Sequence, residues 1–183
     1  MRPYRAMQQF ADRFPALAAE LGPQNLAVLT RAMTTLELPA GRRIIRDRMP
    51  VDSLYFILEG EVSILIEEGG HSISLGRLGP GEWLGEVSVL SGEMLASSTV
   101  RSETPVKLLR LKHQAFEELI MRNEAIAAAM LRELVAMLAA RLRASNDVSR
   151  RPIAIEQVGD SLAATQPIPT GSGQNWLASF FGR

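Results

Sequence analysis

The stretch GEWLGEVSVLSGEMLASSTV, residues 81–100, has the side chains of a loop that holds a phosphate. Its glycines, the acidic Glu86 directly after Gly85, and a run of small and hydroxyl side chains would let backbone N–H groups approach an anion closely. Arginine and lysine, which supply charge-assisted hydrogen bonds to phosphate, are absent from the whole stretch. The pattern predicts either a phosphate pocket or the shell of a former one.

The rest of the sequence offers little other chemistry. The chain has no cysteine, which excludes disulfides, thiolate metal sites and cysteine nucleophiles. His71 and His113, the two histidines, lack the spacing of a metal site, so we expect both on the exposed surface. Neither a nucleophile elbow, a Walker loop nor a paired catalytic constellation is present. We expect no enzymatic activity and no metal.

Composition narrows the class of protein. The chain has 183 residues, with 20 basic and 20 acidic side chains that cancel, so nothing indicates the basic surface that non-specific DNA binding needs. The basic run at residues 41–48, GRRIIRDR, indicates a strand with a solvated face. The N-terminus lacks a signal-peptide core, and no apolar run is long enough for a bilayer. We expect a cytoplasmic protein that does not enter membranes.

Helical periodicity marks both flanks of a central segment. Residues 5–36 are predicted to form two or three short helices, because Leu26, Leu29 and Met33, with Leu36 after them, recur at helical steps. Residues 113–146 return to helix, first as a short piece and then, from the predicted N-cap Asn123, as a long one.

The long helix carries two apolar seams. One has heptad-like spacing, and the second lies beside it; their members are Ala127, Leu131, Leu134 and Leu138, and Ile126, Met130 and Met137. One stripe is enough to dock a helix on a domain, whereas two indicate that a second surface is also buried. Two interpretations stay open: a deeply buried single helix, or a helix that pairs with its twin in a homodimer through the first seam.

Short strands fill the segment between these helical flanks, from about Leu38 to Leu111. Apolar residues alternate with polar ones in runs separated by glycine-bearing turns, and Gly69-Gly70 predicts a hairpin. Two further strands are predicted around Pro105. The alternating positions are Leu54, Phe56 and Leu58, then Val62, Ile64 and Ile66, then Ile73 and Leu75. Many short strands at close spacing predict a sandwich or barrel of the jelly-roll type.

The order of these elements resembles the cyclic-nucleotide-binding domain family, most closely the sensor half of catabolite-activator-type regulators. The resemblance covers residues 10–147 and rests on LPAGRRIIRDRMPVDSLYFILEGEVSIL, LGPGEWLGEVSVL and the closing helix. It implies an α+β fold: a β-roll (jelly roll, double-stranded β-helix) flanked by N-terminal helices and a long C-terminal helix. The implied boundaries are residues 1–36 for the helical segment, 37–147 for the roll and long helix, and 148–183 for a linker and terminal peptide.

The resemblance also implies a ligand site. In the family a Gly-Glu pair, matched by Gly85 and Glu86 with Val87 next, opens a short helix whose N–H groups bind the cyclic phosphate, and the glutamate binds the ribose hydroxyl. About ten residues on, an arginine and a small or hydroxyl residue follow. Ala96 stands at the arginine position and Ser97 at the next. Residues that touch the base are matched by Ser145 and Asn146.

Replacement of the phosphate arginine by Ala96 predicts weak binding of cyclic nucleotide or none. A hydrogen bond to a charged group contributes about 1.5–3 kcal/mol, and each 1.4 kcal/mol is about tenfold in affinity. Arg101 lies four strand residues beyond Ser97, about 13 Å away, while Arg77 on a neighbouring strand stays possible. Three interpretations stay open: a structural or interaction module without ligand, weak binding through backbone donors, or a less charged ligand.

The C-terminal segment has its own pattern. After residue 147 the chain is rich in Pro, Gly, Ser, Thr and Gln, as a linker is, and it ends in NWLASFFGR. Its apolar side chains fall on one face of a short helix: Trp176, Leu177, Phe180 and Phe181. We expect a docking peptide for a protein partner; a membrane contact helped by Arg183 and folding back onto the roll are the alternatives. The segment has no room for a three-helix DNA reader, so no DNA binding is expected.

Overall fold

The computed structural model describes residues 2–68, 71–86 and 95–150, with side-chain burial for 4–67, 72–86 and 95–143. The chain divides into two compact units, Met1–Leu138 and Ala139–Arg183. Within the described residues no helix is long and apolar enough to cross a membrane.

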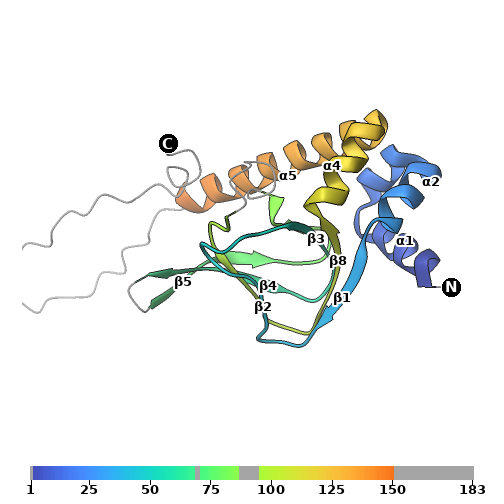
Figure 1. The fold of residues 1–183 in the computed structure, drawn as a ribbon. Helices are drawn as coiled ribbons and strands as arrows, with labels where there is room; N and C mark the ends of the chain where they lie inside the picture. Colours follow the sequence, from blue (N-terminus) through green and yellow to red (C-terminus); the bar gives the residue numbers. More distant parts are fainter. Residues whose placement is uncertain (1, 69–70, 87–94, 151–183) are drawn as a thin grey trace, which may run out of the picture. The chain divides into compact units, whose positions relative to one another are not determined.

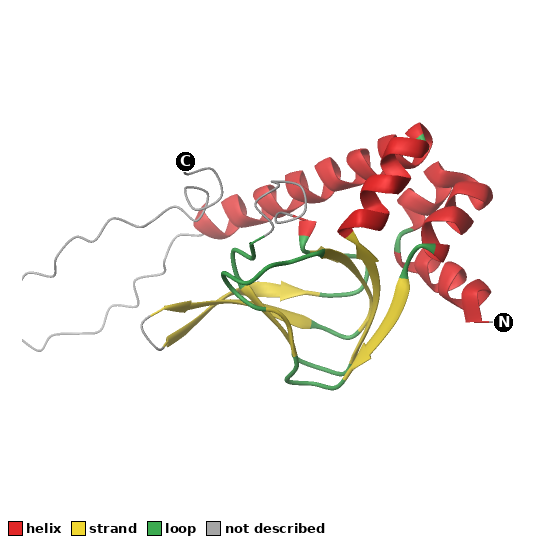
Figure 2. Ribbon diagram, in the orientation of Figure 1, coloured by secondary structure: helices red, strands yellow, loops and turns green. Residues whose placement is uncertain are grey.

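Two four-stranded antiparallel sheets form the roll that the alternating sequence predicts (Figures 1 and 2). The first sheet has the order β1-β8-β3-β6, with β1 at Thr34–Leu38, β8 at Val106–Lys112, β3 at Ser53–Glu59 and β6 at Trp83–Leu84. The second has the order β2-β7-β4-β5, with β2 at Arg43–Ile45, β7 at Thr99–Ser102, β4 at Val62–Glu68 and β5 at His71–Leu78. Strands β4 and β5 pair as the predicted hairpin.

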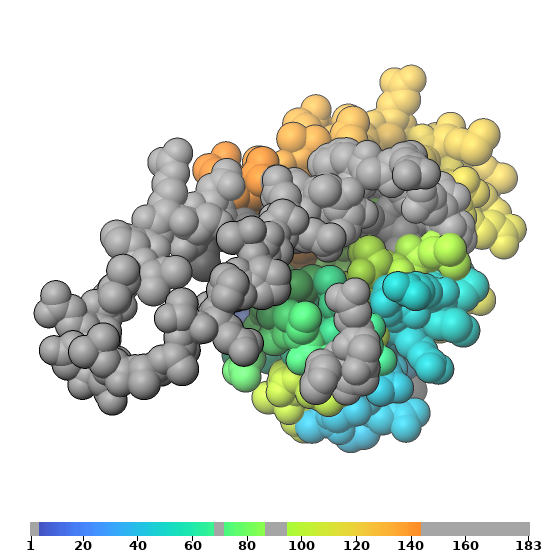
Figure 3. All heavy atoms as spheres, turned by 90° about the vertical axis from the view of Figure 1, so that its left-hand side faces the viewer, coloured from blue at the N-terminus to red at the C-terminus, as the bar shows by residue number. Residues whose placement is uncertain are grey.

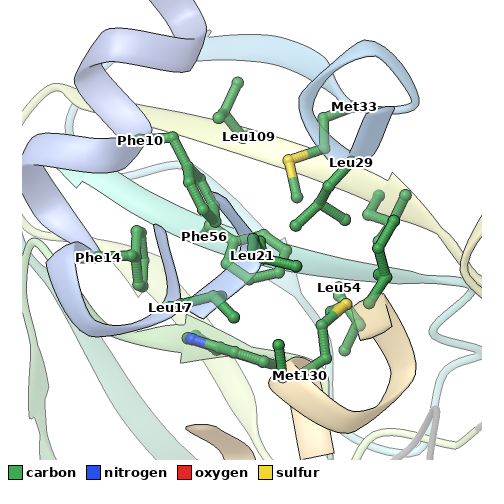
Figure 4. Close-up of a cluster of buried hydrophobic side chains, with 14 of the residues drawn as sticks. Phe10, Phe14, Leu17, Leu21, Leu29, Met33, Leu54, Phe56, Leu109 and Met130 are labelled. Atoms are coloured by element: carbon green, nitrogen blue, oxygen red, sulfur yellow. The ribbon is translucent and has the colours of Figure 1, made fainter. Parts of the chain in front are cut away.

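Helices cover one face of the first sheet. They are α1 (Arg2–Arg13), α2 (Pro15–Arg31), α4 (His113–Arg122) and the start of α5 (Glu124–Arg150). Between these helices and the sheet lies the larger buried cluster, in which Phe10 of α1 and Phe14, the N-cap residue of α2, meet Phe56 of β3 with ring centroids 5.4 and 5.5 Å away (Figure 4). Phe56 also packs against Trp83 at 4.7 Å. Alternation along β3 sends Leu54, Phe56 and Leu58 to this cluster.

A second buried cluster lies between the two sheets. It takes residues from both sheets and from the segments that connect them: Ile45, Val51, Ile57, Val62, Leu78, Leu84, Ala96, Val100, Val106 and Leu108. Because strand neighbours point to opposite faces, Ile57 faces this interior while the residues on either side of it face the helices. The interior of the roll is therefore largely apolar.

The prediction of helices over residues 5–36 is confirmed up to Arg31 and is wrong for residues 34–36. Leu26, Leu29 and Met33 are buried under one face, as expected. Residues 34–36, however, belong to strand β1, and Leu36 packs against the cluster between the sheets. The β-branched pair Thr34-Thr35 favours a strand here. Gly22 (φ 66°), followed by Pro23, kinks α2 into two pieces, which agrees with the predicted two or three helices.

The junction of α4 and α5 is held by Asn123. Its side-chain Oδ1 accepts a hydrogen bond from the Ile126 N–H at 3.1 Å, which is the predicted N-cap. Its backbone N–H donates to the Leu119 carbonyl at 3.0 Å and so also closes α4. Its Nδ2 donates to Oδ1 of Asn25 on α2 at 2.9 Å. One residue, through its backbone and its side chain, therefore ties three helices together.

Candidate functional site

The predicted phosphate cradle begins where β6 leaves the first sheet. Gly85 has φ +82°, and a Cβ added there would lie 2.5 Å from the Ser53 carbonyl oxygen, so the close approach of β3 by itself requires glycine. Glu86 follows with only 6% of its surface exposed. Val87 lies outside the described residues. The packing of β3 alone therefore explains why residue 85 is glycine. The buried carboxylate of Glu86 is the feature that matches the expected ligand site.

Ala96, which the resemblance predicts to stand at the position of the family's arginine, points into the roll. It is 6% exposed and belongs to the apolar cluster between the sheets. Its N–H donates to the Met49 carbonyl and its carbonyl accepts from the Arg48 N–H, both at 2.9 Å. Arg48 and Met49 of one segment thus lie opposite the single residue Ala96 of the other, as in a β-bulge whose first residue has a left-handed backbone conformation. Figure 3 shows these two segments as neighbours, coloured cyan and yellow-green.

Arg48, directly opposite Ala96, does not supply the missing charge to the interior. It is the bulge residue, with φ 58°, a conformation that favours glycine. Its side chain is 90% exposed and lies 3.8 Å from the Asp47 carboxylate. The methyl group of Ala96 is buried in the roll while the guanidinium of Arg48 is in solvent. The bulge therefore turns this cation outward.

Arg101 and Arg77 also lie outside the roll. Ser63 of β4 pairs with Arg101 on one side and with Arg77 on the other, so the three side chains share one face of the second sheet. That face is opposite to Val100, which is buried inside. A hydrogen bond from Ser63, together with Arg101 and Arg77, lowers the pKa of the half-buried Glu103. Both arginines thus belong to a row of charged side chains on the outer face of the second sheet.

The other predicted ligand contacts are only partly described. Ser97 is exposed rather than buried beside Ala96. Ser145 and Asn146 lie within α5, but their side chains are outside the described set, as are Trp176, Leu177, Phe180 and Phe181 of the terminal peptide. Among the described residues the structure therefore brings Gly85, Glu86 and Ala96 to the roll and leaves the base and tail contacts as predictions.

The two predicted seams of α5 have different environments. Ile126, Met130 and Leu134 are buried against the other helices and the first sheet, and Met137 packs beside them. Leu134, a member of the predicted dimer seam, lies in the buried core of the chain itself at 7% exposure. The exposed apolar stripe instead consists of Leu131, Val135 and Leu138, at 60%, 58% and 41% exposure. Ala127, the first member of that seam, is partly buried.

The histidines give no metal site in the described part of the chain. His113 is not fully exposed as expected: its side chain is 25% exposed, and its Nε2 lies 3.2 Å from Glu117 one turn along α4. The side chain of His71 lies outside the described set. No group of three potential ligands occurs among the described residues.

A roll of two antiparallel sheets, covered on one face by helices and carrying a Gly-Glu turn after β6, defines a domain of the β-roll class. Residues 35–123 match the model of the cyclic nucleotide-binding domain. The chain belongs to the cyclic nucleotide-binding domain family.

The proteins to which this chain is similar are of different kinds and include an enzyme and transcriptional regulators. The chain is 36% identical to glutaminase 2 of Bradyrhizobium diazoefficiens over 72% of its own length and 20% of that protein. The N-terminal domain of a transcriptional regulator from Streptomyces coelicolor is 30% identical, with a TM-score of 0.57 over 74% of this chain and 91% of that one. The catabolite activator protein of Thermus thermophilus is 28% identical, with a TM-score of 0.61 over 73% and 61%. The chain spans 20% to 29% of the first three curated relatives.

Two features of the site could not be read from the sequence. The left-handed bulge at Arg48 has no local signal, because arginine replaces the glycine that usually marks such a conformation. The outward direction of Arg77 follows only from its pairing with Ser63, and hence from the strand register. The burial of Ala96, in contrast, agrees with the interpretation of the stretch as an apolar shell.

Proposed function

We propose that this chain is a non-enzymatic regulatory or adaptor module whose roll no longer depends on a cyclic nucleotide. The observation that carries the proposal is the environment of Ala96. A buried methyl group fills the position of the phosphate-binding arginine, and Arg48, Arg77 and Arg101 all face away from the roll's interior. The cradle keeps its glycine and carboxylate, and among the described residues none of these three arginines supplies a cation on its Ala96 side.

The energetic consequence is a large loss of affinity. A phosphate moved from water into an apolar roll loses hydration, and the desolvation of an unpaired charge costs several kcal/mol. Backbone N–H groups offset part of that cost, but the charge-assisted bond of about 1.5–3 kcal/mol is missing. We expect binding of cyclic AMP and cyclic GMP to be at least about tenfold weaker than that of a site with the arginine.

We further propose that the module forms a homodimer through α5. Leu131, Val135 and Leu138 recur at steps of four and three and leave a substantial apolar surface in contact with water. Light scattering of the purified chain should report twice the 20.1 kDa monomer mass. A Leu131→Lys variant should shift the protein to monomer, while the matched exposed variant Met121→Lys on α4 should leave the dimer intact. A wild-type monomer at micromolar concentration contradicts this.

The output of the module is proposed to be contact with a protein partner through the terminal peptide, in the cytoplasm. Four bulky apolar side chains at the end of a polar linker support this: Trp176, Leu177, Phe180 and Phe181. Deletion of residues 170–183 should abolish co-purification of a defined partner in a pull-down, and restoring the peptide on an unrelated carrier should recover it. Unchanged partners after the deletion contradict the docking proposal.

Calorimetry of the full chain with cyclic AMP and cyclic GMP tests the central proposal. No heat of binding at micromolar nucleotide supports a ligand-independent module. Micromolar binding contradicts it and favours the second candidate, a genuine small-molecule sensor that regulates its partner. The buried Glu86 is the observation that favours that candidate, because this carboxylate, at 6% exposure, directly follows Gly85, where the family resemblance expects the residue that binds the ribose hydroxyl.

A further inference from the structure

A groove lies between α2 and α4, on the side of the first sheet that the helices cover (Figure 1). Its volume is about 340 Å³, near the lower end of the range of small-molecule sites. Val28 and Ala32 line it from α2 and its C-cap, and Ala115 and Leu119 line it from α4. Because the two residues of each pair are one helical turn apart, each helix contributes a column of apolar side chains to the groove.

The apolar lining is continuous with the hydrophobic core. Ala32, Ala115 and Leu119 pack against the cluster between the helices and the sheet, whereas Val28 is 43% exposed. Alanines at two wall positions leave space that longer side chains would fill. The groove therefore keeps apolar surface in contact with water, and an apolar chain that covered this surface would be stabilised by its transfer out of water.

The groove is separate from the cradle at Gly85. None of the described residues that line it belongs to the apolar cluster inside the roll, which holds Ala96. The first sheet lies between the two places, since its strand β3 sends Phe56 toward the helices and Ile57 toward the interior. The groove is therefore on the opposite face of the sheet from the ligand site that the family resemblance implies.

The polar part of the lining leaves one cation available. Arg122 lines the groove one helical turn after Glu118, the order that favours an ion pair on a helix. The side chain of Arg122 nevertheless forms neither an ion pair nor a hydrogen bond within the part of the chain that the structure describes, and Glu118 instead accepts a hydrogen bond from Gln114 Nε2 at 3.4 Å. Asn123, the remaining polar lining residue, is engaged by Asn25 and by the α5 N-terminus.

We propose that this groove binds a small amphiphile, an apolar chain that ends in a carboxylate. The chain covers the apolar columns of α2 and α4, and the carboxylate accepts hydrogen bonds from the guanidinium of Arg122. Glu118 repels the same carboxylate, which places the charged end of the ligand at Arg122. The two charged residues of one wall should therefore have opposite effects on the affinity, and a neutral ligand of the same length should respond to neither.

Titration of the full chain with octanoate, followed by NMR at constant ionic strength, tests the site. Saturable shifts of the Val28 and Leu119 methyl resonances are expected. Arg122→Gln should weaken octanoate binding about two- to fivefold, as the loss of an exposed ion pair does. Glu118→Gln should strengthen it, because a repulsion is removed. Octanol, which has the same chain without the charge, should bind equally to the wild type and to both variants.

A matched pair of variants at exposed apolar positions locates the ligand without disturbing the core. Val28→Glu places a negative charge in the groove and should weaken octanoate binding several-fold. Ile73→Glu adds the same charge on β5, where Ile73 is 53% exposed, and should change nothing. Shifts that never saturate at tens of millimolar octanoate, shifts centred on Leu131 and Val135 of α5, or equal effects of the two glutamates would overturn the proposal. So would octanol binding that follows the charge variants as octanoate does.

Discussion

Replacement of Ala96 by arginine should restore nucleotide binding and lower the stability of the free protein. Ala96 is 6% exposed, and its methyl group is surrounded by apolar side chains of the interior cluster. A guanidinium placed there without a counter-ion keeps an uncompensated charge, which destabilises proteins by about 3–5 kcal/mol when the site cannot open. The long side chain relieves part of this if its end reaches water. We therefore expect a loss of about 1–3 kcal/mol of unfolding free energy.

Cyclic nucleotide should reverse this loss. A phosphate opposite the new guanidinium gains about 1.5–3 kcal/mol, which is about a ten- to hundredfold gain in affinity. Calorimetry measures the affinity, and thermal unfolding with and without nucleotide measures the linked stabilisation. The variant should gain far more from nucleotide than the wild type does.

Ala96→Gln is the control, because it adds a side chain of comparable length without charge. It should destabilise the protein through volume alone and gain no affinity. If Ala96→Arg is as stable as the wild type and binds no nucleotide, its guanidinium has turned to solvent, and the assignment of position 96 to the cradle is wrong. If glutamine gains affinity equally, the missing element is not charge.

Three other variants test the local physics. Gly85→Ala should unfold several degrees earlier in a thermal scan, since its Cβ would lie 2.5 Å from the Ser53 carbonyl oxygen; unchanged stability contradicts the required close approach. Arg48→Gly should stabilise by about 1 kcal/mol by relieving a left-handed conformation, as denaturant unfolding would show; a loss means that the arginine side chain stabilises the fold. Burial and the neighbouring Glu20 raise the pKa of Glu133. Its folded pKa lies above the unfolded one, so its contribution to stability is greatest in acid and falls as pH rises through the folded pKa; Glu133→Gln should flatten that dependence in thermal scans across mildly acidic to neutral pH.

Local patterns were sufficient to predict the roll because each buried strand carries its own alternation. Leu54, Phe56 and Leu58 indicate the face toward the helices without reference to the rest of the chain. The pattern misled where two periods overlap: Leu36 continues the helical steps of Met33 but lies in a strand. Tertiary pairing of β1 with β8 outweighs helical periodicity there.

The sequence does not determine which face of the long helix α5 is buried. Its two apolar seams are both visible in the sequence, but their spacing does not say which one faces the domain. Leu134 enters the core while its neighbour Val135 stays exposed, a difference of one residue, or 100° of rotation about a helix. That rotation depends on the direction in which α5 leaves Asn123, and the contact of Asn123 with Asn25 on α2 helps to fix that direction. Tertiary contacts, absent from any local pattern, therefore decide which leucines remain available.

The shared cap at Asn123 has a mechanical consequence. Because the same residue ends α4, starts α5 and holds Asn25, the direction in which α5 departs is coupled to the position of α2. A second contact, the ion pair between Arg132 of α5 and Glu20 of α2, joins the same two helices further along α5. A change in the direction of α5 must therefore either move the N-terminal helices with it or break both contacts. A force applied to the long helix is transmitted in this way to the N-terminal helices.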